Sequence, residues 1–280
     1  MIDAHVHFWK FDEMRDAWIT EDMKTIRKDF FPGDLAPLLR QNNVEGVVGV
    51  QADQSENETQ FLLALSKQFS FIKGIVAWTD LQNKNVEERL VHYSKEPAIK
   101  GFRHIVQSEA AGFLKREKFL NGIHSLQKFN FTYDLLIYEN QLKEAVEFVN
   151  QFPGLPLIID HCAKPSIKNR SIGDPISIGW NTWMKEISKN ENVYCKLSGL
   201  ITEAKWNEWG EEDLYPYLDA VFEYFGAERI VFGSDWPVML LSGNYAGWKS
   251  VVEKYLAKFP EAEREKVFSK NAIRFYKLNT

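Results

Sequence analysis

Residues 1–9 read MIDAHVHFW, and this stretch decides the fold. Successive side chains of a β-strand point to opposite faces, so the spacing predicts that Asp3, His5 and His7 share one face. The other face would then carry the apolar side chains of Ile2, Ala4, Val6 and Phe8. At the mouth of a closed parallel barrel, such a strand turns its imidazoles into a polar site and its apolar side chains toward the surrounding helices.

Seven more short runs of β-branched or apolar residues follow, separated by segments with helical periodicity. We expect strands at residues 2–8, 45–51, 71–78, 99–105, 131–138, 156–161, 192–197 and 229–235. Helices are expected at residues 56–69, 86–95, 111–128, 141–151, 178–189, 214–225 and 248–258, with a final one at 261–276 that closes the bottom of the barrel or flanks it. This alternation predicts an α/β fold, a (β/α)8 TIM barrel, as a single domain over residues 1–280.

Composition narrows the classes of partner. The 280 residues are 45% hydrophobic and 26% charged, which is typical of a well-packed globular protein. A net charge of −5 and the lack of a long basic run argue against nucleic acid and anionic membranes, so a small molecule is the expected partner. The sequence shows no signal-peptide pattern, and its two cysteines, Cys162 and Cys195, are far apart, so we expect a cytoplasmic protein without disulfides. The oligomeric state is left open.

Residues that could carry chemistry lie at the ends of predicted strands. They are His5 and His7 on the first strand, His161 on the sixth and Asp235 on the eighth. Barrel enzymes place their catalytic residues at this end of the strands. With His104 on the fourth strand, four of the six histidines fall at strand ends, which favours a site over the alternative that each one fills the core or the surface. For Asp235, which precedes Trp236-Pro237, the alternative is a turn or a helix cap.

Five more side chains are candidate substrate ligands. The planar guanidinium of Arg103 could bind an anionic or hydroxyl-rich group, with a surface arginine as the alternative. Gln51 and Lys196 could bind hydroxyls, Trp236 could stack on a sugar ring, and Tyr138 could close the pocket. The long connections at residues 10–32 and 163–176 are expected to shape the pocket.

Five motifs, in chain order, resemble the amidohydrolase superfamily. They are Asp3-Ala4-His5-Val6-His7, Gly101-Phe102-Arg103-His104, Ile159-Asp160-His161-Cys162-Ala163-Lys164-Pro165, Val193-Tyr194-Cys195-Lys196-Leu197-Ser198-Gly199-Leu200 and Gly233-Ser234-Asp235-Trp236-Pro237. More narrowly, the chain is similar to the branch of L-fuconolactonases and L-rhamnonolactonases, which is related to the 2-pyrone-4,6-dicarboxylate lactonases. The resemblance runs from Met1 to Tyr276.

The resemblance also bears on metals. The superfamily's two-metal site uses a carboxylated lysine or glutamate on strand four and a histidine on strand five. Here strand five has no histidine, and strand four offers Arg103, whose cationic guanidinium cannot act as a ligand. A binuclear centre is therefore not expected. One divalent metal such as zinc could still be held by His5, His7, His161 and Asp235, but the similarity to lactonases implies turnover that requires no cofactor.

The resemblance finally implies roles for these residues. Asp235 would act as general base on water, while His5, His7 and His161 polarise the carbonyl of the substrate. The expected function is a carboxylic ester hydrolase that opens an aldonolactone, such as L-fucono- or L-rhamnonolactone. The alternatives are a mononuclear metal-dependent amidohydrolase or decarboxylase of the same superfamily, and a non-catalytic barrel that binds a sugar acid. The identity, ring size and stereochemistry of the lactone stay open.

Overall fold

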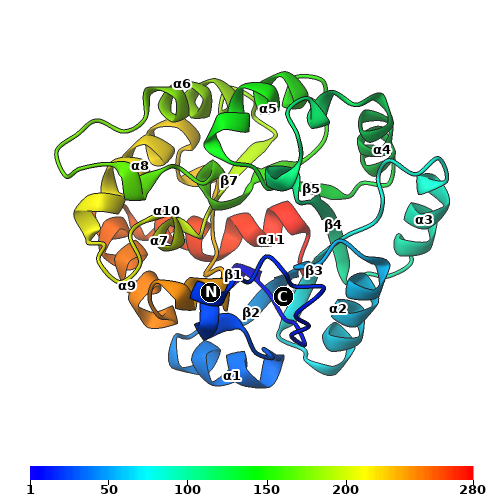
Figure 1. Ribbon diagram of the computed structural model, residues 1–280, viewed down its shortest axis with the longest axis horizontal. Helices are drawn as coiled ribbons and strands as arrows, with labels where there is room; N and C mark the ends of the chain where they lie inside the picture. Colours follow the sequence, from blue (N-terminus) through cyan, green and yellow to red (C-terminus); the bar gives the residue numbers. More distant parts are fainter. Residues whose placement is uncertain (280) are drawn as a thin grey trace.

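The computed structural model describes residues 1–279, and its eight strands form one parallel sheet in sequence order (Figure 1). The strands are β1 (Ile2–Val6), β2 (Gly46–Val50), β3 (Ile72–Ala77), β4 (Ile99–His104), β5 (Thr132–Leu135), β6 (Leu157–Ile159), β7 (Val193–Leu197) and β8 (Ile230–Phe232). All eight predicted strands are confirmed. Most of them end earlier than predicted, so His7, Gln51, Tyr138, His161 and Asp235 lie just beyond the strands.

The sheet closes between β8 and β1. The backbone N–H of His7 donates to the carbonyl of Trp236 at 2.7 Å, and the N–H of Asp235 donates to the carbonyl of His5 at 2.9 Å. The predicted (β/α)8 barrel is thereby confirmed. Because these bonds form the seam of the barrel, the same backbone that closes the sheet places His5, His7 and Asp235 side by side.

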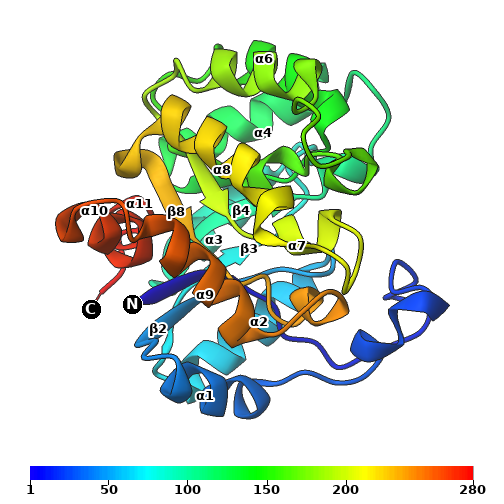
Figure 2. The same cartoon turned by 90° about the vertical axis from the view of Figure 1, so that its left-hand side faces the viewer.

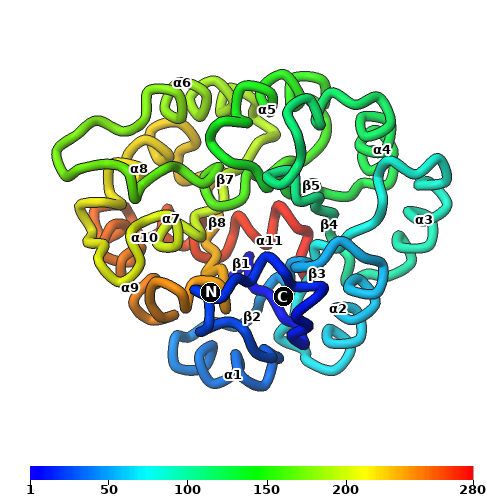
Figure 3. Tube along the Cα trace, in the orientation of Figure 1, coloured from blue at the N-terminus to red at the C-terminus, as the bar shows by residue number. Residues whose placement is uncertain are grey.

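Helices surround the barrel, and the chain can be followed around it in Figure 3. They are α1 (Pro32–Gln41), α2 (Glu56–Gln68), α3 (Val86–Tyr93), α4 (Glu117–Lys128), α5 (Leu142–Val149), α6 (Ile178–Ile187), α7 (Leu200–Glu203), α8 (Glu211–Phe225), α9 (Tyr245–Leu256), α10 (Glu261–Glu265) and α11 (Asn271–Tyr276). Two of these helices were not predicted: α1, which contains two prolines, and the four-residue α7. The predicted final helix is divided by a π-helical turn, Lys266–Lys270. Among residues 1–279, no helix has the length and apolar character needed to cross a bilayer.

Helix α11 closes the bottom of the barrel. Its Ala272, Phe275 and Tyr276 pack in one apolar cluster with the strand residues Ile2, Ala4, Val48, Val50, Val76, Ile158 and Val231. Figure 2 shows α11 at one end of the molecule and the loop at residues 10–30 at the opposite end. The barrel interior is therefore sealed by hydrophobic packing at the bottom, and its polar side chains lie toward the loops.

A β-bulge in β1 changes which side chains face the interior. The step from Asp3 to Val6 on β1 lies opposite the shorter step from Val47 to Gly49 on β2, so β1 holds one extra residue. Asp3 accepts a hydrogen bond from the Tyr245 hydroxyl of α9 at 2.8 Å and so faces the helices. The prediction of one common face for Asp3, His5 and His7 is therefore wrong for Asp3. The predicted apolar face is also split, because Ile2 and Ala4 pack inside the barrel while Val6 and Phe8 pack in the outer layer.

Candidate active site

A cavity of about 240 Å³ lies beyond the C-terminal ends of the strands. It is lined by His7, Trp18, Ala52, Arg103, Ile105, Gln107, Ser108, Leu136, His161, Lys164, Asp235 and Val238. Trp18 and Lys164 come from the two long connections that were expected to shape a pocket. Four of the predicted site residues, His7, Arg103, His161 and Asp235, therefore share one pocket wall with both loops.

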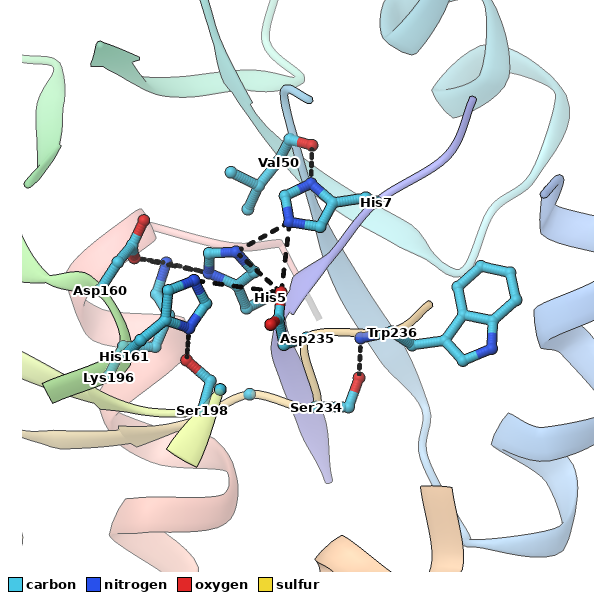
Figure 4. Close-up of polar contacts among 12 residues, drawn as sticks. His5, His7, Val50, Asp160, His161, Lys196, Ser198, Ser234, Asp235 and Trp236 are labelled. Atoms are coloured by element: carbon cyan, nitrogen blue, oxygen red, sulfur yellow. Dashed lines mark hydrogen bonds and ion pairs between the residues drawn. The ribbon is translucent and has the colours of Figure 1, made fainter. Parts of the chain in front are cut away.

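The Asp235 carboxylate lies among three imidazoles at the base of this pocket (Figure 4). Its Oδ1 is 3.4 Å from Nε2 of His7, 3.7 Å from Nε2 of His5 and 4.0 Å from Nε2 of His161. All four side chains are buried. Burial alone would raise the pKa of Asp235, but the three imidazoles outweigh it and hold the pKa below its ordinary value. The structure thus brings together residues that lie in or just after β1, β6 and β8.

A chain of hydrogen bonds sets the protons of two of these rings. His7 Nδ1 lies 2.8 Å from the Val50 carbonyl, which only accepts, so this nitrogen carries the proton and Nε2 keeps its lone pair. Lys196 donates from Nζ to Nδ1 of His5 at 3.1 Å, which places the proton of His5 on Nε2. That proton then points to Nε2 of His7 at 3.1 Å. Burial and the Lys196 charge lower the pKa of His5, in agreement with a neutral ring.

An unusual left-handed turn after β6 aims His161. The φ angles of His161, Cys162, Ala163 and Lys164 are 53°, 51°, 59° and 45°. Left-handed helical geometry costs an L-residue about 1–2 kcal/mol, so four in succession need external support. Trp180 supplies part of it by donating from Nε1 to the Cys162 carbonyl at 2.8 Å.

Two residues after β7 hold the His161 ring. The Ser198 hydroxyl lies 2.9 Å from Nδ1 of His161. Gly199 has a φ of 65°, and a Cβ at this position would lie 2.5 Å from the same nitrogen. Burial lowers the pKa of His161 to about 4, so the ring is neutral near pH 7.

A buried network of charges lies directly beneath the histidines. Lys196 Nζ is 2.6 Å from Oδ2 of Asp134 and 2.8 Å from Oδ1 of Asp160. Arg103 donates to the other Asp160 oxygen at 2.9 Å and to the carbonyl of Gln51. Burial opposes the Asp160 charge, but the Lys196 and Arg103 cations hold its pKa well below its usual range. Burial raises the pKa of Asp134 to about 6, with Lys196 opposing the shift.

The other predicted substrate ligands have protein partners. Gln51 donates to the Arg103 carbonyl at 3.2 Å, and Lys196 is fully buried in the charge network. Trp236 is also buried, with its ring 5.3 Å from that of Phe30. Tyr138 is 42% exposed and carries the Lys164 ammonium over its ring at 5.4 Å. Their roles as substrate ligands stay predictions.

Sequence reasoning missed four residues of this region. Asp134 and Asp160 carried a readable signal, because each is a carboxylate inside or next to an apolar strand run, where burial demands a partner. Ser198 lies two residues after Lys196 at the end of β7, which could have marked it. Lys164 carried no such signal, because its direction depends on the left-handed turn.

The histidine cluster could hold a divalent metal ion. His5, His161 and Asp235 each offer one ligand atom, and these atoms lie within 4.8 Å of one another. Imidazole nitrogen and carboxylate oxygen are ligands that zinc accepts. The donor set therefore fits a single ion, with Nε2 of His7 beside it.

Known proteins that are similar to this chain point to one family. The sequence profile of the family described as amidohydrolase matches residues 2–278. The chain is 33% identical over 284 residues to an L-fucono-1,5-lactonase of Burkholderia multivorans, covering 99% of this chain and 96% of that protein. It is 27% identical over 203 residues to an L-rhamnono-gamma-lactonase of Scheffersomyces stipitis, covering 64% of this chain and 59% of that one. A crystal structure of a Burkholderia multivorans amidohydrolase with bound zinc superposes with a TM-score of 0.95 at 34% identity, covering 99% of both chains.

Proposed function

The chain belongs to the amidohydrolase family, and from this premise we propose that it is a hydrolase that opens a sugar-acid lactone. Two relatives named as lactonases of L-fucono- and L-rhamnono-lactones support an aldonolactone as the substrate. The observation that carries the proposal is the position of Asp235, whose Oδ1 lies within 4.0 Å of three imidazole nitrogens in a polar pocket. A small-molecule substrate fits a cavity of about 240 Å³.

In this proposal Asp235 is the general base. Its lowered pKa keeps the carboxylate ionised at neutral pH, so it can take a proton from water as the water oxygen attacks the ring carbonyl. The Nε2–H group of His161 stabilises the negative charge that forms on the carbonyl oxygen. The Nε2–H of His5 is donated to His7, so His5 acts on the site through that ring. His7, whose Nε2 accepts from His5, holds that ring in place.

We propose further that turnover requires no metal or other cofactor. The chain from Lys196 through His5 and His7 to Val50 gives all four ring nitrogens of the two histidines a hydrogen-bond partner within the protein. A metal on Nε2 of His5 would require the proton to move to Nδ1, next to the Lys196 cation. When bound, an ion held by His5, His7, His161 and Asp235 would supply a Lewis acid for the carbonyl.

In this proposal the predicted substrate ligands fall into two groups: those at the pocket and those that act through a neighbouring residue. Arg103 lines the pocket and contacts the substrate directly, and the partly exposed Tyr138 adjoins the pocket through Lys164, whose ammonium lies over its ring. Gln51 and Lys196 act through their neighbours Arg103 and His5, and Trp236 supports the seam of the barrel. The single-domain organisation and the cytoplasmic location stay predictions from the sequence.

A screen of aldonolactones in metal-free buffer with a pH indicator tests the proposal, because ring opening releases acid. We expect turnover of at least one sugar lactone by the wild-type protein and only background by D235N. Turnover of a carboxylated pyrone alone would move the substrate to another lactone class. Activity that appears only with added zinc or manganese would support the metal-dependent alternative, and binding without turnover would support the sugar-acid-binding barrel.

A further inference from the structure

The proposed lactone hydrolysis leaves one proton unassigned. When the bond between the carbonyl carbon and the ring oxygen breaks, the ring oxygen leaves as an alkoxide, which is strongly basic. A general acid that donates a proton to it lowers the barrier. The identity of this acid rests on the proposed function, because the proton is needed only if a lactone ring is opened.

Most polar groups of the described pocket wall are unsuited to donate this proton. In the proposed function Asp235 takes up a proton as the base, and His161, held at Nδ1 by Ser198, donates its Nε2–H to the carbonyl oxygen. His7 carries its proton on Nδ1, which points to Val50, and its Nε2 accepts from His5. Arg103 does not release a proton in proteins, and the amide and hydroxyl of Gln107 and Ser108 are weaker acids still. Of the lining residues in the described chain, Lys164 alone is left as a cationic group able to lose a proton.

The position of Lys164 suits this task. Its side chain is 18% exposed and lines the same pocket as His161 and Asp235. The ammonium is 3.5 Å from Oε1 of Glu203 and lies over the ring of Tyr138, so it is held from two sides. A surface lysine would need no such support.

The backbone gives an independent indication. Lys164 ends the left-handed turn, and its N–H donates to the His161 carbonyl at 2.8 Å. The turn carries four left-handed residues without a glycine, which a loop of ordinary purpose would avoid. Strain of this kind persists where the surrounding structure enforces it, and it gathers at functional sites. One strained segment thus aims both His161 and Lys164 into the pocket.

We propose that Lys164 is the general acid that protonates the leaving ring oxygen. Asp235 takes one proton from water, and the water oxygen forms the new bond to the carbonyl carbon. The bond to the ring oxygen breaks, its electron pair stays on that oxygen, and the oxygen takes a proton from the Lys164 ammonium. Lys164 then regains a proton from solvent on its Glu203 side, and Asp235 and the acid product release theirs. The sum is lactone and water in, hydroxy-carboxylate and one proton out.

Two substitutions test the role. K164M removes the ammonium, and K164R keeps the positive charge but does not release a proton. We expect both to lower kcat on an aldonolactone by about 10²–10⁴-fold with KM within a few fold of wild type. K168M, in the exposed part of the same loop, is the matched control and keeps wild-type kcat. Thermal unfolding checks that each variant is folded. If K164M does not fold, K164R alone tests the role of the Lys164 proton.

The ring-sulfur analogue of the same lactone gives a readout that a structural role would not move. A thiolate leaves without protonation, so we expect the K164M and K164R defects to shrink to a few fold. Three results would overturn the proposal: wild-type kcat in K164R, a change confined to KM, or equal defects on both lactones. In each case Asp235 would be the group that returns the proton to the ring oxygen. A wild-type protein that opens no lactone would instead overturn the proposed function itself.

Discussion

Nζ of Lys196 lies 3.1 Å from Nδ1 of His5, directly below the candidate active-site pocket. The same ammonium neutralises Asp134 and Asp160, and all of these side chains are fully buried. The proton position on His5 and the charge balance of the barrel core therefore depend on one lysine.

K196M is expected to destabilise the protein by about 3–5 kcal/mol, because it leaves two buried carboxylates without this partner. The double variant K196M/D134N should recover part of that loss, since it also removes one of the charges. Urea denaturation measures both. K189M, at an exposed lysine, is the control and should change the free energy of unfolding by no more than about 0.5 kcal/mol. A K196M protein as stable as K189M would show that Lys196 does not stabilise the buried carboxylates.

D235N is expected to lower kcat by about 10²–10⁴-fold, because the amide cannot accept the proton from water. Binding should persist, since the amide has nearly the same shape. Calorimetry with the hydroxy-acid product measures binding, and the pH-indicator assay measures kcat. Unchanged turnover in D235N would show that Asp235 is not the base.

G199A is expected to reduce kcat by displacing His161, because the new Cβ would lie 2.5 Å from its Nδ1. G112A is the matched control: Gly112 has a φ of 88°, and its Cβ would meet nothing within 4 Å. Both variants should lose about 1–2 kcal/mol of stability from the left-handed backbone. Only G199A should lose activity, and equal kcat values would argue against a role for the His161 position.

Removal of metal is expected to leave kcat unchanged. The protein is dialysed against a strong chelator, its zinc content is measured by mass spectrometry, and kcat is compared before and after. Metal-free protein with full activity supports the hydrogen-bonded arrangement of the histidines. Activity that disappears with the zinc and returns on its addition would favour the metal-dependent alternative.

Glu58 makes stability depend on pH. Burial raises the pKa of Glu58 from 4.5 to about 7 in the folded protein, so the folded state holds this proton at pH values where the unfolded chain has lost it. The resulting stabilisation is fully present below pH 4.5 and is lost as the pH rises through 7. E58Q cannot ionise and can still accept the bond from the Ala52 N–H.

E58Q should therefore gain stability relative to wild type between pH 5 and pH 8, by up to about 3 kcal/mol. Urea denaturation at both pH values measures the gain. The exposed E88Q is the control and should show none. A gain of the same size at both pH values would mean that the Glu58 charge is not the cause.

Periodicity was enough to predict the eight strands, because the apolar runs at strands such as Leu157–Ile159 are short and well separated. The cluster of His5, His161 and Asp235 also followed from strand order, since parallel strands end at the same side of a barrel. Features that depend on local backbone geometry escaped prediction. The bulge in β1 turns Asp3 toward the helices. The left-handed turn that positions Lys164 contains no glycine, the residue that would have predicted such a backbone. Helix α1 was missed because Pro32 and Pro37 read as loop residues.

Helix α11, which closes the bottom of the barrel, is linked to the histidines by a chain of buried polar contacts. Its Tyr276 hydroxyl donates to Asp134 at 2.7 Å, Asp134 accepts from Lys196, and Lys196 donates to His5. One electrostatic column thus runs along the barrel axis from a remote helix to the reacting centre. A substitution that removes the Tyr276 hydroxyl would therefore take a donor from Asp134 and reach the histidines from the far end of the barrel.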